Sequence, residues 1–232
     1  MSEKRAVQQG KPAFLFDLDG TLIDSVYEHV LAWREALREL GIELSTWRIH
    51  RRVGMSGGLI LNALQRETGR QLTREEAERL KKLHGEAFQK RLPEVRPLPG
   101  AKELLSMLTR LKVPWAIATT GKTRDARPAI EMLEAGSNVH LITRDDVPHG
   151  KPFPDLFLAA AGRLKADIHD CIVVGDSVWD LLASRRAHAL GVGLLSGGYG
   201  EEELERAGAY RVYADPAELS RHIDELGVEV EI

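Results

Sequence analysis

Aspartate residues recur in short runs that directly follow apolar stretches of this sequence. The run Asp17-Leu-Asp19-Gly-Thr follows the residues AFLF, and the run GDSVWD contains Asp176 and Asp180. Two aspartates at positions i and i+2 after a strand can take different roles, one as an ionised nucleophile on a metal and one as a protonated general acid. We therefore expect Asp17 to be the nucleophile and Asp19 the acid.

Three of these carboxylates, on Asp17, Asp176 and Asp180, are expected to point into one crevice. Two like charges about 4 Å apart repel by roughly 4 kcal/mol at an effective dielectric of 20, so a cation must be present. Carboxylates, a carbonyl and waters are the hard oxygen ligands that suit Mg²⁺, which retains water and a substrate phosphate in its shell. The acidic cluster thus predicts a magnesium site for phosphoryl transfer.

Thr119 and Lys151 are the residues expected to bind the phosphate group. Lys151 supplies a fixed positive charge, Thr119 supplies a hydroxyl, and the following turn, residues 120–122, supplies backbone N–H groups for phosphate oxygens. Taken singly, each of these features also has a purely structural explanation. The Thr119 hydroxyl could bond to the backbone at the strand end, and Lys151 could be a solvated surface lysine. The Asp-x-Asp run could form a turn with an Asx cap. Their order along the chain, together with GDSVWD, favours a catalytic site.

Short apolar, β-branched runs are the elements that must position these residues. They are typical of buried parallel strands and occupy residues 13–18, 113–120, 140–143, 171–175 and 192–195. Helical patterns follow at residues 124–135, 154–164 and 178–189, with Lys151 opening the second of them. The alternation predicts an α/β fold with a doubly wound parallel sheet, whose ligands bind at the carboxyl ends of the strands.

The stretch from residue 25 to residue 96 breaks this rhythm, because it shows helical periodicity and no convincing strand. We expect it to be a helical domain inserted after the first strand, so that residues 1–24 and 97–232 form the α/β core. Its far boundary falls in PEVRPLPG, where three prolines stiffen the link and a glycine follows.

Composition excludes several classes of partner. The net charge of −3 gives no electrostatic reason to expect nucleic acid or an anionic membrane as partner. No stretch approaches the roughly 18 apolar residues of a membrane span, and the N-terminus lacks the apolar segment of a signal peptide. Cys171 is the single cysteine and is expected to be a buried, inert thiol. We expect a cytoplasmic protein, a monomer or a homodimer, whose partner is a small phosphorylated metabolite.

Four motifs in order along the chain resemble those of the haloacid dehalogenase-like hydrolases, in particular the phosphoglycolate phosphatase and β-phosphoglucomutase group, which has a small helical cap. These are FDLDGTLIDS, IATT, GKPFPDLF and GDSVWD. The resemblance implies that Asp17 forms an aspartyl-phosphate, while Asp19 shuttles the proton to the leaving oxygen and later takes one from water. It also implies phosphate binding by Thr119 and Lys151.

The resemblance further implies a Mg²⁺ ion held by Asp17, the backbone carbonyl of Asp19, and Asp176, with Asp180 close by. Thr120 and Gly121 stand where many relatives have asparagine, so the phosphate contact expected of Thr120 departs from the family pattern. The resemblance implies a phosphatase or a phosphosugar mutase, which share all the core residues named above. Dehalogenases of the family manage without the second aspartate and the metal, so this chain is expected to act on phosphorus.

Two motifs imitate other functions. Ser56 lies in a G-x-S-x-G pattern typical of serine esterases, but the preceding residues, STWRIHRRV, favour a helix and not the required strand. Residues 121–123, Gly-Lys-Thr, imitate the end of a P-loop, but the first glycine of that motif would fall on Ala116, inside a strand. A non-catalytic binding protein would have no need of the paired Asp17 and Asp19.

The substrate is expected to be read by the loop of residues 54–58 in the inserted domain. Its members are Gly54, Met55, Ser56, Gly57 and Gly58. Glycine permits positive φ and a close approach to a ligand, so this loop is expected to close over the site. The nearby Arg51 and Arg52 either bind a second anionic group or lie on a solvated helix face.

Overall fold

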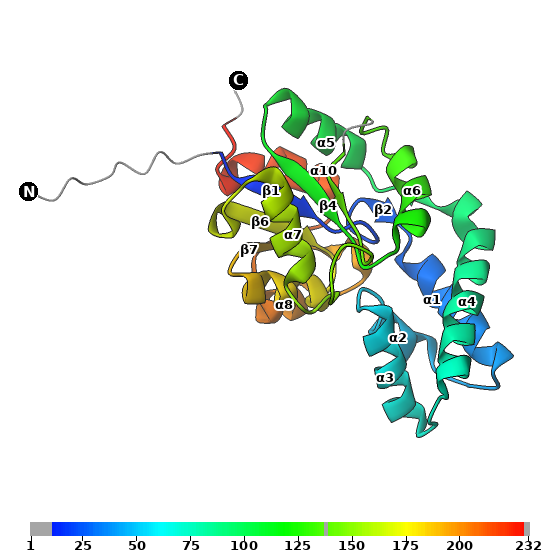
Figure 1. The fold of residues 1–232 in the computed structure, drawn as a ribbon. Coiled ribbons are helices and arrows are strands. Elements are labelled where there is room, and N and C mark those ends of the chain that lie inside the picture. Colours follow the sequence, from blue (N-terminus) through cyan, green and yellow to red (C-terminus); the bar gives the residue numbers. More distant parts are fainter. Residues whose placement is uncertain (1–10, 137–138, 230–232) are drawn as a thin grey trace, which may run out of the picture.

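The structure, a computed structural model, describes residues 11–136 and 139–229. Figure 1 shows a sheet flanked by helices and, beside it, a group of helices formed by an early part of the chain. Among the described residues, no helix combines the length and the apolar character that a membrane crossing requires.

The main sheet is parallel throughout. In the described part of the chain it has six strands: β1 (Ala13–Phe16), β4 (Trp115–Ala118), β5 (Leu141–Ile142), β6 (Cys171–Gly175), β7 (Leu190–Leu194) and β8 (Ala209–Tyr213). Their order is β5-β4-β1-β6-β7-β8, and every neighbouring pair is parallel. The predicted doubly wound parallel sheet is confirmed.

Strand β1 lies at the point where the chain reverses the direction in which it adds strands. On one side Phe14 is paired with Trp115 of β4, and on the other with Ile172 of β6. The chain builds outward through β4 to β5 and then returns to the far side of β1. A crevice forms outside the carboxyl ends of the strands at such a reversal, which places a site directly after β1.

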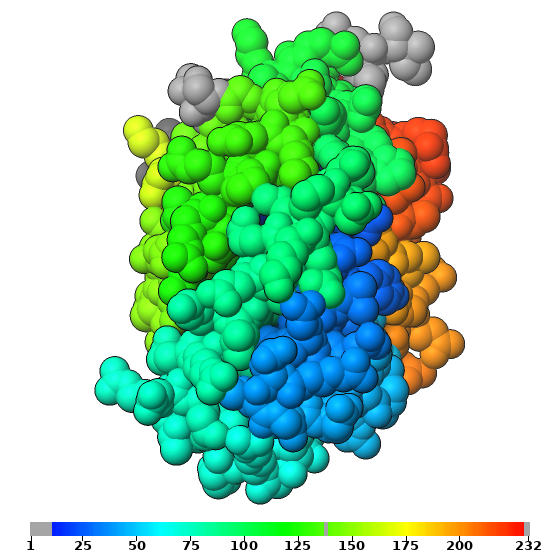
Figure 2. All heavy atoms as spheres, turned by 90° about the vertical axis from the view of Figure 1, so that its right-hand side faces the viewer, coloured from blue at the N-terminus to red at the C-terminus, as the bar shows by residue number. Residues whose placement is uncertain are grey.

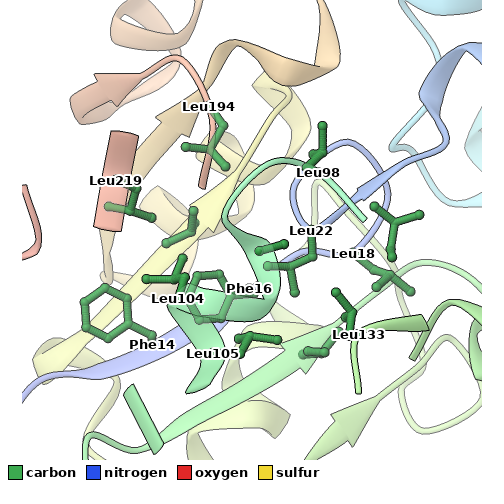
Figure 3. Packing of buried hydrophobic residues seen from close by; sticks show 14 of the residues in the cluster. Phe14, Phe16, Leu18, Leu22, Leu98, Leu104, Leu105, Leu133, Leu194 and Leu219 are labelled. Carbon is green, nitrogen blue, oxygen red and sulfur yellow. The ribbon is translucent and has the colours of Figure 1, made fainter. Parts of the chain in front are cut away.

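Side chains of β1 alternate between the two faces of the sheet. Phe14 and Phe16 are fully buried in one cluster, where Figure 3 shows them near Leu104 and Leu105 of α5 (Ala101–Arg110). Leu219 of α10 (Pro216–Arg221) belongs to the same cluster. Each buried phenylalanine contributes roughly 1.5–3 kcal/mol of transfer free energy. This packing fixes the orientation of the strand that carries the first aspartates.

The opposite face of β1 packs against α7 (Asp155–Leu164) and α8 (Val178–Ala187). Leu15 is fully buried there together with Phe157 of α7 and Ala183 of α8. By the same alternation, the side chain of the next odd-numbered residue, Asp17, faces α7 and α8. The burial pattern of the strand therefore aims the aspartate before any polar contact is considered.

Shorter elements complete the α/β part. Helix α6 (Thr123–Met132) follows β4, and α9 (Glu201–Ala207) packs against β8. The described residues also form 3-10 helices at η1 (Leu92–Glu94), η2 (Ile168–Asp170), η3 (Leu195–Gly197) and η4 (Ile223–Leu226). Cys171 is buried at the start of β6, and burial raises the pKa of its thiol to about 11, as expected for an inert cysteine.

Between the end of β1 and the start of α5, the chain forms the helices α1 (Val26–Glu39), α2 (Thr46–His50), α3 (Gly57–Thr68) and α4 (Arg74–Arg91). Helices α1 and α4 lie side by side along the outer face of this helical segment (Figures 1 and 2). The segment has a hydrophobic cluster of its own, which includes Val30, Leu37, Leu61 and Leu80. A two-stranded antiparallel sheet, β2 (Ile23–Asp24) with β3 (Arg96–Pro97), joins its two ends.

Helix α4 of this segment begins with a capping box formed by Thr73 and Glu76. Thr73 accepts a hydrogen bond from the Glu76 backbone N–H at 3.1 Å, and the Glu76 side chain accepts one from the Thr73 N–H at 2.9 Å. This capping box fixes the start of α4, the longest helix of the segment.

The five predicted strands are confirmed, and three further strands in residues 11–136 and 139–229 were missed. β8 is an edge strand with exposed Tyr210 and Arg211, so its sequence AYRVY lacks the continuous apolar run of a buried strand. β2 and β3 have two residues each, too few for any periodicity to appear. These two strands pair with each other across more than 70 residues of intervening chain, a contact that local patterns do not carry.

Candidate active site

Three strand ends bring the predicted residues together. Asp17 follows β1, Thr119 follows β4 and Asp176 follows β6, each within one residue of the strand end. Asp180 lies in the first turn of α8, and Lys151 comes from the turn before α7. The sequence predicts that Lys151 opens this helix. Instead, Lys151 precedes the first residue of α7 by four positions. All five side chains are buried.

Lys151 connects two of the aspartates. Its ammonium group donates a hydrogen bond to Asp17 Oδ1 and lies 2.7 Å from Asp180 Oδ1. The same group lies 5.1 Å from the ring centroid of Phe157. Although burial alone would lower it, the pKa of Lys151 is raised by the charges of Asp17 and Asp180, so the lysine stays protonated. It is a fixed cation beside the expected nucleophile.

The Asp176 carboxylate is enclosed by backbone. Thr21 Oγ1 donates to Asp176 Oδ1 at 3.2 Å. A Cβ atom at Gly197 would overlap the other carboxylate oxygen, and one at Gly20 would lie 2.6 Å from it. Any side chain larger than that of glycine at these two positions would collide with the Asp176 carboxylate. Thr21 and Gly197 are site residues that the sequence analysis did not identify, although Thr21 belongs to the Asp-x-Asp-Gly-Thr run.

The aspartates lie close enough to share a cation. Ligand oxygens of Asp17, Asp176 and Asp180 lie within 4.8 Å of one another. Burial raises the pKa of Asp17 from 3.8 to about 7, against the lowering effect of Lys151. Burial and the charges of Asp180 and Asp17 raise the pKa of Asp176 well above its usual range. Carboxylates that are hard to ionise at close range fit a site whose charge is completed by a hard divalent cation.

Asp180 is held on both sides. One of its oxygens faces Lys151, and the other accepts hydrogen bonds from the backbone N–H of Ser177 at 3.2 Å and from the Ser177 hydroxyl. Ser177 is thereby the N-cap of α8, with Asp180 at its third position. Helix capping thus fixes the carboxylate that orients Lys151.

Thr119, which is expected to bind phosphate, already takes part in one hydrogen bond. Its Oγ1 accepts a hydrogen bond from the Gly121 N–H at 3.0 Å. This is the structural alternative that the sequence analysis gave for Thr119, a hydroxyl bonded to backbone at the end of the strand. Its own hydroxyl proton remains available as a donor. Thr120 is only partly buried, and no side-chain hydrogen bond places it toward the aspartates.

Asp19 points to a different set of partners. Ser25 Oγ donates to Asp19 Oδ1 at 2.6 Å, and His29 Nε2 lies 3.3 Å from the same oxygen. Burial would raise the pKa of Asp19, but His29 and Ser25 outweigh it and hold the pKa below its usual value. In the absence of substrate these contacts favour the ionised form of Asp19.

His29 continues into an aromatic stack within the helical segment. Its Nδ1 lies 3.3 Å from Nε2 of His84, and His84 stacks on Trp33 with ring centroids 4.1 Å apart. The ring of Phe88 lies 3.8 Å from that of His29. Neither histidine was identified from the sequence, because α1 and α4 meet only in the fold. Burial and the charge of His29, against the opposing charge of Asp19, hold the pKa of His84 well below 6.5.

We expect the protein to lose stability in mild acid because of His84. In the folded state this imidazole stays neutral, whereas the unfolded chain binds a proton at its usual pKa near 6.5. The free energy of unfolding should therefore fall as the pH drops below about 6.5, by up to about 1.4 kcal/mol per pH unit from this group. Denaturant unfolding between pH 7 and pH 5 measures the slope.

A His84→Gln variant should show a shallower slope, even if lost packing against Trp33 lowers its stability at pH 7. His169, which is exposed on η2, provides the matched control in His169→Gln. Equal slopes for the wild type and His84→Gln would show that His84 does not carry the acid sensitivity.

The predicted loop of residues 54–58 meets the α/β part through Gly54 and Ser56. Gly54 has φ of +91°, and a Cβ atom there would lie 3.0 Å from Ser177 Oγ. Met55 is buried in the hydrophobic cluster of the helical segment. Gly57 and Gly58 begin α3, have no positive φ, and face open space. Of these three glycines, only Gly54 uses the positive φ that glycine permits.

Ser56 does not form a nucleophile elbow. It is the N-cap of α3, follows a turn and no strand, and its backbone N–H donates to the Lys151 carbonyl at 3.1 Å. Ala116 lies inside β4, so the Gly-Lys-Thr run of residues 121–123 is no P-loop. Both imitations were correctly set aside from the sequence.

Arg51 and Arg52 are engaged in ion pairs. Arg51 pairs with Glu203 of α9, and Arg52 pairs with Glu67 of α3, whose Oε1 lies 2.9 Å from Arg52 Nε. Neither guanidinium lies on a purely solvated helix face.

Comparisons with known proteins identify the family of the chain. Residues 11–188 match the model of the haloacid dehalogenase-like hydrolases. The crystal structure of a hydrolase from Pseudomonas syringae superposes with a TM-score of 0.91 at 53% identity, covering 93% of this chain and 99% of that one. Hexitol phosphatase A of Escherichia coli K12 is 32% identical over 75% of this chain and 78% of its own length. Phosphoglycolate phosphatase of Neisseria meningitidis is 31% identical over 83% of both chains.

Proposed function

The chain belongs to the haloacid dehalogenase-like hydrolases and is a phosphatase of that family, and we propose that it hydrolyses a small phosphate monoester through an aspartyl-phosphate on Asp17, with Mg²⁺. The observation that carries this proposal is the buried set of Asp17, Lys151, Asp176 and Asp180 at the carboxyl end of the central strand. It combines a nucleophile, a fixed cation and a cluster of hard oxygen ligands in one crevice.

Asp17 is the nucleophile in this proposal. Its orientation is fixed by the β1 packing, and its contact with Lys151 keeps a carboxylate oxygen in place. The carboxylate attacks phosphorus in line with the departing alcohol, and the P–O bond to the alcohol breaks as the aspartyl-phosphate forms. Water then attacks the phosphorus of the aspartyl-phosphate and returns Asp17 with both of its oxygens.

Asp17, Asp176 and the backbone carbonyl of Asp19 would hold the magnesium ion, with Asp180 adjacent. When bound, the ion supplies charge neutralisation for the phosphoryl group and for the carboxylates around it. Lys151 supplies the second positive charge, and Asp180, fixed by Ser177, keeps it in position. The hydroxyl of Thr119 and the backbone N–H groups after it donate to the phosphate oxygens.

Asp19 gives a proton to the departing alcohol. A phosphate dianion beside it raises the pKa of a carboxyl group, so substrate binding favours the protonated form of Asp19. His29, with Nε2 at 3.3 Å, is the neighbouring group from which that proton can come. The hydrogen bond of Ser25 keeps the carboxyl group on the side of the helical segment.

The helical segment of residues 25–96 acts as the cap in this proposal. It touches the α/β part around the site through Ser56 N–H to the Lys151 carbonyl, and through His50 Nε2, which lies 2.7 Å from the Gly197 carbonyl. The short β2–β3 pair is the hinge at its base. Closure of the segment excludes bulk water from the phosphoryl group until the alcohol has left.

We expect Asp19→Asn to slow the hydrolysis of alkyl phosphates by about 10²- to 10⁴-fold, the range typical of a lost general acid. An aryl phosphate, whose leaving group hardly needs a proton, should lose much less. The comparison of kcat/KM for sorbitol 6-phosphate and 4-nitrophenyl phosphate in the wild type and the variant measures the difference.

Asp24→Asn is the matched control, because Asp24 is an exposed aspartate on the hinge strand β2. It should leave both activities close to those of the wild type. An equal loss on both esters in Asp19→Asn would contradict the acid role.

A further inference from the structure

The arginines before the loop of residues 54–58 each lie beside a glutamate. Arg52 Nε lies 2.9 Å from Glu67 Oε1, and Arg48 Nη1 lies 3.7 Å from the other oxygen of the same glutamate. Arg51 pairs with Glu203 and also lies over the ring of Tyr199, 4.6 Å from its centroid. Arg51 and Arg52 are therefore each committed to a close glutamate partner, while Arg48 makes only the longer contact.

Two histidines, a serine and a glycine of the cap touch the α/β part around the site. His29 contacts Asp19, His50 contacts the Gly197 carbonyl, and Ser56 contacts the Lys151 carbonyl. Gly54 approaches Ser177. The cap therefore presents imidazole, hydroxyl and peptide groups to the site.

A cavity of about 40 Å³ lies beside Asp19, on the side where the departing alcohol receives its proton. The residues that line it include Asp19, Asp125, Ser25 and His29, and Asp125 Oδ1 also lies 3.1 Å from Nε of the exposed Arg124. The remaining wall is formed by Gly121 and by apolar side chains such as that of Phe88, and no lysine or arginine lines the cavity among the described residues. Carboxylates accept hydrogen bonds from hydroxyl groups and repel other anions.

We infer that the natural substrate is a phosphate ester of an uncharged polyhydroxy alcohol, such as a sugar or polyol phosphate, and not an ester that carries a carboxylate or a second phosphate. The inference rests on the proposed phosphatase function. The phosphate is held by Lys151 and Thr119, and the hydroxyl groups of the alcohol meet Asp19, Asp125, Ser25 and His29. The apolar wall packs against its C–H groups.

The same observation separates a phosphatase from a phosphomutase. A mutase must hold a doubly phosphorylated intermediate in two orientations, so its cap needs cationic groups for the second phosphate. The arginines beside the cap loop are paired with Glu67 and Glu203. Water, and not a second phosphate ester, then takes the phosphoryl group from Asp17.

The experiment uses the full-length enzyme and two pairs of esters that differ only in charge. Sorbitol 6-phosphate is compared with 6-phosphogluconate, and 2-hydroxyethyl phosphate with 2-phosphoglycolate, with 4-nitrophenyl phosphate as the reference. We expect kcat/KM to be at least about tenfold higher for the uncharged member of each pair, as one uncompensated charge contact of about 1.4 kcal/mol would give.

Asp125→Asn tests the wall of the cavity directly. Removal of this carboxylate should raise kcat/KM for 6-phosphogluconate by about three- to tenfold and change that for sorbitol 6-phosphate less. Glu131→Gln, at an exposed position of the same helix, is the matched control and should change neither value. Arg51→Gln should leave the ratio of the two values within about twofold.

Two results would overturn the inference while the proposed function stands. One is an equal or higher kcat/KM for the carboxylate esters, and the other is a selective loss of 6-phosphogluconate turnover in Arg51→Gln. If the carboxylate esters were preferred, Lys122→Gln would show whether the exposed lysine at the N-cap of α6 binds their carboxylate. Loss of turnover on every ester, the aryl ester included, would overturn the proposed function and this inference with it.

Discussion

An Asp17→Asn variant is expected to lose at least about 10⁴-fold in kcat on every phosphate ester, whether its leaving group is activated or not. The amide keeps the shape of the side chain and cannot attack phosphorus, so neither the aspartyl-phosphate nor its hydrolysis can occur. Lys151, Thr119 and Asp176 bind the phosphate and the metal but contain no group that replaces the nucleophile. The loss should therefore exceed that of Asp19→Asn, which spares the attacking group.

The fold should survive this substitution. Burial raises the pKa of Asp17 to about 7, which means that the folded protein disfavours its charged form. A neutral amide removes that unfavourable charge, and Lys151 keeps Asp180 as partner at 2.7 Å. The melting temperature of Asp17→Asn at pH 8 should thus equal or exceed that of the wild type.

Turnover in ¹⁸O-labelled water adds a check on the wild-type enzyme. Label should enter the released phosphate and stay out of the Asp17 carboxylate, because water attacks phosphorus. Label in Asp17 would indicate attack at the carbonyl carbon, as in an ester intermediate, and residual kcat above about 1% in Asp17→Asn would show that another residue is the nucleophile.

The sheet was predictable because parallel strands buried on both faces have a distinctive sequence. Continuous apolar runs such as CIVVG at residues 171–175 occur where both faces of the strand are covered, by α7 and α8 on one side and by α5 and α10 on the other. The edge strand β8 lacks that environment, because its residues Tyr210 and Arg211 are both exposed and only Tyr213 is fully buried. Prediction therefore succeeded at the centre of the sheet and failed at its edge.

The residues after the central strands were predictable for a related reason. Asp17, Thr119 and Asp176 each end an apolar run, and a parallel sheet brings such ends to one edge whatever the connecting loops do. The role of Lys151 could be predicted only from the order of the motifs along the chain, because a lysine before a proline does not indicate a function by itself. The site could thus be assembled from topology together with residue type.

The partners of Asp19 could not be predicted in this way. His29 and His84 lie on α1 and α4, and they meet because these helices pack side by side and because the β2–β3 pair holds the base of the segment. Helical periodicity shows which residues share a face of one helix, but not which residue faces it from another. The same limit explains Arg51, whose pairing with Glu203 depends on how the segment meets α9.

Removal of divalent metal by a chelator is expected to lower kcat/KM by about 10³-fold or more, and Mg²⁺ should restore it. Without a cation, Asp17, Asp176 and Asp180, with ligand oxygens within 4.8 Å of one another, repel a phosphate dianion, and Lys151 alone cannot balance them. Charge stabilisation by a bound metal is worth several kcal/mol in such a transition state, which sets the expected factor.

Ca²⁺ should bind and inhibit. Its oxygen ligands lie about 2.3–2.6 Å from the ion, compared with about 2.0–2.1 Å for Mg²⁺, and its coordination shell is larger and less strictly octahedral. The phosphorus would then be displaced from its line with Asp17. Glycine at positions 20 and 197 lets the Asp176 carboxylate sit against the backbone, which leaves that ligand little freedom to adapt to a larger ion.

A readout that does not depend on turnover separates metal binding from catalysis. Mg²⁺ binds the folded protein and not the unfolded chain, so at 100 times its dissociation constant it should add about 2.7 kcal/mol to the free energy of unfolding. Asp176→Asn should lose most of this stabilisation together with its activity, whereas Asp19→Asn, which offers only its backbone carbonyl, should keep it. Full activity in the chelator, or equal stabilisation of the wild type and Asp176→Asn by Mg²⁺, would show that these aspartates do not form the metal site.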